Sequence, residues 1–344
     1  MNDKYLCLNC WRISHVNDLI GQPHWREPPD GRLGDLYPHS FWRQTLLGLA
    51  PKDPYQLAVQ DDREVKCKCG EPMPECAKLP TERVSAIRII GPKNSGKTFF
   101  LITMLDSFNR MQSEEMALRG ICDTSQRFGQ ISSALLKDRR RPEANVTGEP
   151  YAWKIMDAQV EQHPMLAFHD FGGQIWEQVD RNIPENLTNY LALPGHLILV
   201  LDGARIARDL NLAFQDANPG DSVDDLSILE HITKNWNRQD YNNTKLALVI
   251  TKADILWEEY PVLREACASL SKTDEKQEYL RQFIIKSGRK ALVIFVEQRF
   301  RDACIFASSS LGFCPEERDQ FERQPEPLGT LLPLLWLLDI EAPV

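Results

Sequence analysis

Short apolar runs alternate with segments of helical spacing over most of the chain. Each run has the length of a buried strand, and the segments between several of them repeat apolar residues at helical intervals. The runs cover residues 84–90, 151–156, 165–168, 197–201, 246–250 and 304–306. The helical segments cover residues 99–111, 223–237, 276–299 and 328–338. This alternation predicts an α/β fold with a mostly parallel sheet between layers of helices.

The pattern changes near residue 80. Residues 1–80 are rich in Pro, Trp, Gly and Cys, and only residues 40–49 have the spacing of a short helix, which Pro51 would end. A stretch of this kind needs an additional constraint to fold. We therefore predict a small cysteine-rich module at residues 1–80 and an α/β domain at residues 81–344.

Composition narrows the class of protein. The 344 residues are 42% hydrophobic, which is enough to bury a full core, and the net charge of −9 opposes an extended surface for nucleic-acid phosphates. No apolar run approaches the ~20 residues that span a bilayer, and the first residues do not resemble a secretory signal. We expect a cytoplasmic protein without a membrane span, for which nucleic acid is a poor partner.

A glycine-rich loop follows the first apolar run. Its sequence is Gly91-Pro92-Lys93-Asn94-Ser95-Gly96-Lys97-Thr98. An apolar run before the loop and helical spacing after it distinguish a P-loop from a chance turn. Such a loop binds phosphates through backbone N–H groups and a helix N-terminus, with the lysine on the β and γ phosphates and the threonine hydroxyl on Mg²⁺. The loop predicts a P-loop NTPase, a three-layer sandwich, and phosphate contacts from Gly91, Asn94, Ser95, Gly96, Lys97 and Thr98. It does not distinguish ATP from GTP.

A second loop follows the apolar run at residues 165–168. It contains Asp170-Phe171-Gly172-Gly173-Gln174 and resembles the Asp-x-x-Gly-Gln element of Ras-like GTPases. Asp170 can hold Mg²⁺ through water, and the Gly173 amide can approach a γ phosphate closely. Gln174 falls where that family has the glutamine that orients the attacking water, so we assign catalysis to Gln174 together with Lys97. A purely structural Asp-Phe-Gly-Gly turn is the alternative.

The apolar run at 246–250 ends in a candidate base-recognition loop. Its sequence, Thr251-Lys252-Ala253-Asp254, resembles the Asn-Lys-x-Asp guanine element with Thr in place of Asn. The Asp254 carboxylate can accept the ring N–H and the exocyclic amine of guanine, which adenine does not offer together. Lys252 is expected to lie along the purine and ribose. The threonine at position 251, where the family element has asparagine, affects how the loop is anchored. A surface Lys and Asp without this role is the alternative.

A serine-rich sequence follows the last apolar run. It resembles the Ser-Ala loop whose backbone amide contacts the guanine oxygen, and it leaves open whether Ser308 or Ser309 makes that contact. An ordinary serine-rich strand end is the alternative.

A GTPase also needs a threonine in its first switch loop. We choose Thr147, which lies in a polar stretch bounded by Pro142 and Pro150, to complete the Mg²⁺ shell when a γ phosphate is present. An ordinary loop threonine is the alternative. The basic run at 139–141 could supply an arginine finger in cis or form a solvated turn.

Taken in order, these elements resemble the TRAFAC-class GTPases, which include the Ras-like and Arf-like proteins, over residues 84–312. The resemblance implies GTP and GDP as ligands, and it marks residues 257–301 as a helical insertion. The cysteine-rich leader and the apolar sequence at 331–338 further resemble the bacterial Double-GTPase group of defence or conflict systems. That narrower resemblance implies a protein partner, either another GTPase or an effector.

Cysteines in the first module are spaced for a metal. Cys7 and Cys10 form a C-x-x-C pair, and Cys67 and Cys69 can supply the other half of a tetrahedral zinc site with a structural role. Cys76 could replace Cys67 or Cys69, and unpaired cysteines are the alternative. The sequence thus predicts a zinc-ribbon-like module.

These residues predict a GTP-binding switch that hydrolyses GTP to GDP and phosphate. Two alternatives remain open at this point. The chain could be a scaffold that binds GTP or GDP with negligible turnover, or the zinc module could bind nucleic acid under the control of the nucleotide.

Overall fold

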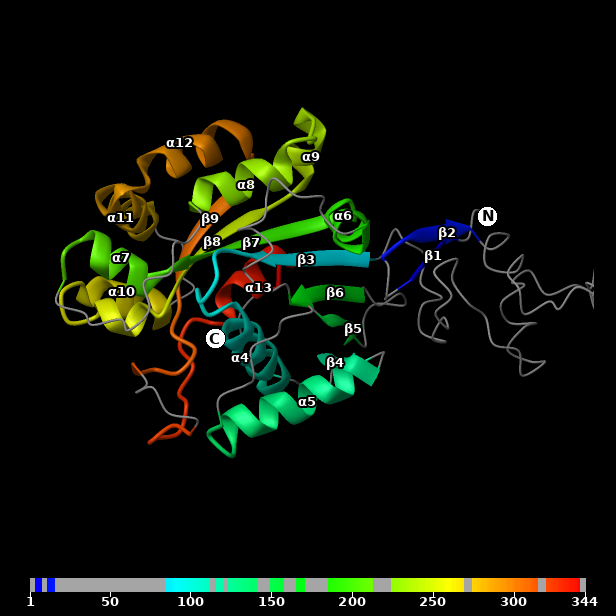
Figure 1. Cartoon of the computed structure of the whole chain (residues 1–344), viewed down its shortest axis with the longest axis horizontal. Helices are drawn as coiled ribbons and strands as arrows, with labels where there is room; N and C mark the ends of the chain where they lie inside the picture. The colour runs from blue at the N-terminus through cyan, green and yellow to red at the C-terminus, as the bar shows by residue number, and fades with distance from the viewer. Residues whose placement is uncertain are drawn as a thin grey trace, which may run out of the picture. The chain divides into compact units, whose positions relative to one another are not determined.

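A seven-stranded sheet is the main element of the fold (Figure 1). The computed structural model describes residues 4–7, 11–15, 84–111, 116–120, 123–140, 149–157, 165–170, 185–212, 224–268, 274–314 and 320–340. The chain divides into two units, of which the first contains residues 1–84 and 184–192 and the second contains residues 85–183 and 193–344.

The sheet is mostly parallel, and its strands follow the order β4-β5-β6-β3-β7-β8-β9. Their bounds are β3 (Val84–Ile90), β4 (Met116–Gly120), β5 (Glu149–Asp157), β6 (Met165–Asp170), β7 (Gly195–Asp202), β8 (Leu246–Thr251) and β9 (Ala303–Ala307). Strands β3, β7, β8 and β9 pair in parallel, whereas β5 is antiparallel to both β4 and β6. All six predicted apolar runs lie in this sheet, which confirms the α/β prediction, and the arrangement fits a P-loop NTPase.

Helices cover both faces of the sheet (Figure 1). Helices α4 (Lys97–Arg110), α5 (Asp123–Leu136) and α13 (Leu332–Leu337) contribute apolar side chains to a core that includes Ile87 and Val200. The opposite side carries α8 (Asp225–Thr233), α9 (Arg238–Asn243), α11 (Asp274–Ile284) and α12 (Lys290–Arg299). Two further helices, α7 (Gly203–Asp209) and α10 (Pro261–Ala268), follow β7 and β8. A central strand covered on both faces is a continuous apolar run, which explains why residues 197–201 of β7 are all buried.

Three sequence-based helix predictions need correction. The predicted helix 276–299 is two helices, α11 and α12, joined by a five-residue π-helical turn (Ile285–Arg289) in which Gly288 has a φ of 86°. A left-handed residue of this kind interrupts a helix, and glycine adopts it without steric cost. The predicted helix 328–338 covers only residues 332–337, and the predicted helix 223–237 ends at Thr233. Helix α5 and strand β4 were not predicted.

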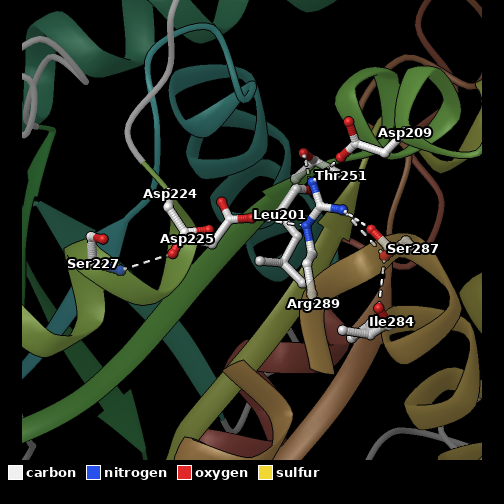
Figure 2. Close-up of polar contacts among 9 residues, drawn as sticks. All are labelled: Leu201, Asp209, Asp224, Asp225, Ser227, Thr251, Ile284, Ser287 and Arg289. Carbon is white, nitrogen blue, oxygen red and sulfur yellow. Dashed lines mark hydrogen bonds and ion pairs between the residues drawn. The ribbon is translucent and has the colours of Figure 1, made fainter. Parts of the chain in front are cut away.

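A buried ion pair joins the start of α8 to the π-helical turn (Figure 2). Arg289 is 7% exposed, and its Nε atom donates to Asp225, which is 1% exposed, over 2.9 Å. The same guanidinium contacts Asp209 at the end of α7 and donates to the backbone oxygen of Ser287. Burial raises the pKa of Asp225, and the Arg289 charge opposes this change. One arginine thus connects three segments of the fold.

The described residues of the first unit form a two-stranded antiparallel sheet and one helix. Strands β1 (Lys4–Leu6) and β2 (Ile13–His15) pair with each other, and α6 (Glu185–Leu191) belongs to the same unit. Trp11 packs on Tyr190 with ring centroids 4.9 Å apart, and Arg12 forms an ion pair with Glu185. A segment far along the chain therefore packs within the same unit as the N-terminal strands.

Among the described residues, none of the helices has the length and apolar character needed to cross a membrane.

Candidate functional site

The predicted phosphate and base residues gather at the carboxyl ends of parallel strands. The phosphate loop follows β3, the Thr251–Asp254 loop follows β8, and the serines follow β9. Because β3, β7, β8 and β9 run parallel, these loops share one edge of the sheet. Ligands of open α/β sheets bind at this edge.

The phosphate loop is shaped by two glycines and by a buried lysine. Gly91 has a φ of 153°, and a Cβ atom there would lie 2.6 Å from the Val200 backbone oxygen. Gly96, with a φ of 84°, is the residue before α4. Lys97 is 6% exposed, and its Nζ atom donates to the backbone oxygens of Gly91 and Pro92 over 3.0 and 2.6 Å. The loop therefore surrounds a cation that attracts phosphate oxygens.

Thr98 and Asp170 are the predicted Mg²⁺ ligands among the described residues. Thr98 lies half-buried in the first turn of α4, and Asp170 is the last residue of β6. Strand β6 neighbours β3 in the sheet, and Figure 1 shows the two strands pointing the same way. The two residues thus lie at the same edge of the sheet.

Thr251 joins the base-recognition loop to the phosphate loop. Its buried hydroxyl donates to the Ser95 backbone oxygen over 2.6 Å, and it also lies 3.2 Å from the Leu201 backbone oxygen. The threonine therefore anchors the loop, a role that the sequence alone left open. Hydrogen bonds that fix two loops in one geometry also fix the distance between the groups that these loops carry.

Lys252 is held in place by the neighbouring strand. Its backbone is left-handed with a φ of 50°, and its Nζ atom lies 3.0 Å from Asp202 at the end of β7. Asp202 also accepts a hydrogen bond from the Ala204 amide and so caps α7. This ion pair leaves the aliphatic part of the lysine as an apolar surface for a planar ring.

Asp254 is oriented by the loop at residues 308–312, which follows β9 and which we call the serine loop. The Ser309 hydroxyl donates to Asp254 Oδ1 over 2.5 Å, and it accepts from the Gly312 amide over 2.9 Å. Burial raises the pKa of Asp254, whereas the Ser309 hydrogen bond and the charges of Lys252 and Arg323 lower it. A half-buried carboxylate that accepts from one hydroxyl keeps acceptor capacity for further N–H groups.

The serine amides differ in their hydrogen bonding. The Ser308 amide donates to the Ile250 oxygen over 2.8 Å, and the Ser309 amide donates to the Leu328 oxygen over 2.9 Å. Both amides are therefore engaged within the protein. In the described part of the chain, the Ser310 amide makes no hydrogen bond. Spacing could not distinguish among three consecutive serines, and Ser310 was not singled out.

Several predicted site residues lie outside the described residues. These are Thr147, Gly173, Gln174, Cys10, Cys67, Cys69 and the alternative ligand Cys76. Cys7 is buried in the first unit. Within the described ranges, no group of three or more His, Cys, Asp or Glu side chains is placed to hold a metal ion.

Comparisons with known proteins show distant likeness to solved structures. No protein-family model matches the chain. No match was found among the curated proteins. The chain is similar to the Methanosarcina barkeri Roco2 RocCORdC structure bound to GDP, with 16% identity and a TM-score of 0.24, over 52% of this chain and 41% of that chain.

The chain is also similar to the S. cerevisiae Ski7 GTPase-like domain. Against its complex with GDP and inorganic phosphate, identity is 14% and the TM-score 0.38, over 74% of this chain and 49% of that one. Against its GTP complex, identity is 11% and the TM-score 0.33, over 74% of this chain and 50% of that one. The chain spans half of these structures or less, so its function is inferred from its own residues.

Proposed function

We propose that this chain binds a guanine nucleotide with Mg²⁺ and hydrolyses GTP. The observation that carries the proposal is the hydrogen bond from the Thr251 hydroxyl to the Ser95 oxygen. It fixes a loop with a guanine-type carboxylate, Asp254, against a loop built for phosphates. A nucleotide has its base at one end and its phosphates at the other, so the loop with Asp254 can bind the base while the phosphate loop binds the phosphates.

The proposed phosphate contacts follow from charge and position. Lys97 binds the β and γ phosphates, and the loop amides surround them. Thr98 and Asp170 hold Mg²⁺, which neutralises developing charge on the phosphates, and Thr147 joins them in the triphosphate state. The Gly173 amide contacts the γ phosphate, and Gln174 orients the attacking water.

The proposed base contacts involve three groups. Asp254 accepts the two N–H groups of guanine, and Lys252 lies along the purine ring. The guanine oxygen needs a donor, and we assign this contact to the Ser310 amide because the amides of Ser308 and Ser309 already donate to backbone oxygens. Ser308 and Ser309 then shape the loop rather than contact the base.

The experiment that tests the proposed function has two parts. GTP and GDP should bind in the presence of Mg²⁺ and should not be displaced by ATP or ADP. In single-turnover assays, Gln174→Leu should lower the rate of GTP hydrolysis by roughly tenfold or more, because the water loses its orienting group.

Gln298→Leu is the matched control, since Gln298 is exposed on α12. Equal slow rates in the wild type and in Gln174→Leu would indicate a nucleotide-binding scaffold instead. Competition by adenine nucleotides would contradict guanine recognition.

The signalling role is a further part of the proposal. Loops ordered by a γ phosphate provide a surface that a second protein can recognise. We therefore propose a cytoplasmic switch whose partner is another GTPase or an effector, in a bacterial defence or conflict system. A partner that bound the GDP and GTP forms equally would contradict this role.

We also propose a structural zinc site in residues 1–80. The motivating observation is the C-x-x-C pair that begins at Cys7, which directly follows β1 and whose amide donates to the Arg12 oxygen. The purified chain should contain one zinc ion, and Cys7→Ser and Cys10→Ser should each lower that content and the stability of the module. A wild-type chain that contains no zinc and is as stable without added zinc as with it would exclude the site.

A further inference from the structure

Asp202 lies directly beside the base-recognition loop in the sheet. It is the last residue of β7, and its Cα atom is paired with that of Thr251 at the end of β8. Its exposed fraction is 9%. The sequence did not single it out, because an aspartate before a helix is an ordinary capping residue. The parallel register nevertheless places its carboxylate next to the first residue of the loop that carries Lys252 and Asp254.

One oxygen atom of Asp202 serves two elements. Asp202 Oδ1 lies 3.0 Å from Lys252 Nζ and accepts a hydrogen bond from the Ala204 amide over 3.1 Å. The second contact caps α7, and the first joins β7 to the base-recognition loop. A helix cap is made equally well by serine, asparagine or aspartate, so it does not require a charge. The ion pair with Lys252 is the contact that requires one.

The backbone keeps these two side chains close to each other. Gly203 follows Asp202, and a Cβ atom there would lie 2.4 Å from the Thr251 backbone oxygen and 2.8 Å from the Lys252 backbone oxygen. Real Cβ atoms do not approach other atoms so closely, so the start of α7 packs directly on the loop. The separation of Asp202 and Lys252 is therefore set by backbone packing as well as by the side chains.

The aliphatic part of Lys252 extends beside the phosphate loop. A Cβ atom on Gly96 would lie 3.9 Å from Lys252 Cε, which is an ordinary van der Waals distance. The lysine side chain is 31% exposed, so part of its surface is accessible to a ligand. With its ammonium on Asp202, the lysine presents its apolar methylene groups between the phosphate loop and the base-recognition loop.

We propose that Asp202 is a positioning residue for purine binding: its carboxylate holds the Lys252 ammonium, so that the lysine methylenes are in place along the base before the nucleotide binds. The inference rests on the proposed function. A free lysine side chain loses rotamer freedom when a ligand immobilises it, and this loss weakens binding. An ion pair that already exists in the unliganded chain removes most of that loss.

The test compares GDP with inorganic pyrophosphate as ligands of the full-length chain in Mg²⁺, by titration calorimetry. Asp202→Ser keeps an oxygen that can cap α7, but it is shorter and uncharged and does not hold the ammonium. It should weaken GDP binding by roughly three- to tenfold, the effect of immobilising one flexible side chain. Pyrophosphate has no base, and it should bind this variant at least as tightly as the wild type, because a nearby negative charge is gone.

Three further variants separate positioning from a structural role. Asp202→Asn keeps the cap and the shape and loses only the charge, so its GDP affinity should lie between those of the wild type and Asp202→Ser. Asp224→Ser is the matched control, since Asp224 is exposed and caps α8 through the Ser227 amide. It should leave both affinities unchanged. In a Lys252→Met background, Asp202→Ser should not lower GDP affinity further, because no ammonium remains to be held.

Each outcome decides between the two statements. Unchanged or increased GDP affinity in Asp202→Ser would overturn the role of Asp202 and leave guanine binding intact. An equal loss of GDP and pyrophosphate affinity would also overturn it, because the effect would then lie at the phosphate loop. A loss that persists in the Lys252→Met background would do the same. GDP affinity that does not respond to Asp254→Asn would instead contradict the proposed function itself.

Discussion

Replacing Asp254 by asparagine should weaken GDP binding by about a hundredfold or more and should raise the affinity for xanthosine diphosphate. Two hydrogen bonds to a charged acceptor each contribute about 1.5–3 kcal/mol, and asparagine can accept only one of them while its NH₂ group opposes the guanine amine. Xanthine has an oxygen in place of that amine, so the asparagine amide donates to it. Competition between the two diphosphates measures the change directly.

Asp302→Asn is the matched control, since Asp302 is exposed at the start of β9 and far along the strand from the serines. It should leave both affinities unchanged. The Ser309 hydroxyl, 2.5 Å from Asp254 Oδ1, can also donate to an asparagine oxygen, so the loop geometry is expected to survive. Unaltered preference for GDP over xanthosine diphosphate would remove Asp254 from the base site.

Replacing Arg289 by methionine should lower the free energy of unfolding by about 3–5 kcal/mol, because Asp225 would remain buried without its charge partner. Figure 2 shows how the guanidinium lies between Asp225, Asp209 and Ser287. The Oδ1 atom of Asp225 has no hydrogen-bond partner among the described residues, so the carboxylate depends strongly on the arginine. Urea unfolding at neutral pH measures the loss.

The loss should become smaller as pH falls. A carboxyl whose pKa is raised in the folded state destabilises the fold only where it is ionised, so protonation relieves the cost. The double variant Arg289→Met/Asp225→Leu should recover much of the stability, since no buried charge remains. Arg301→Met, at an exposed position, serves as the control. A single variant as stable as the wild type at neutral pH would refute the account of this pair.

The central strands were predictable because their environment is simple. A strand covered by helices on both faces is mostly apolar, so residues 197–201 of β7 and 246–250 of β8 appear as uninterrupted runs, and the run of β3 is broken only by Ser85 and the buried Arg88. Strand β4 was not predicted because its five residues, Met116–Gly120, include a charged residue and a terminal glycine and so do not form an apolar run. Gly288 was the available signal for the break between α11 and α12, but glycine inside a helical pattern does not by itself establish a left-handed backbone.

By itself, the sequence determined the α/β class, the phosphate loop around Lys97 and the placement of Asp254 after a strand, because local spacing and strand periodicity specify such features. Only the tertiary structure decided that Thr251 anchors the base loop and that Ser309 rather than Ser308 orients Asp254. The hydrogen bond from Thr251 to Ser95 joins residues 156 positions apart, and the bond from Ser309 to Asp254 joins residues 55 apart. Contacts at such separations depend on how the sheet brings strand ends together, and residue spacing along one chain does not encode that distance.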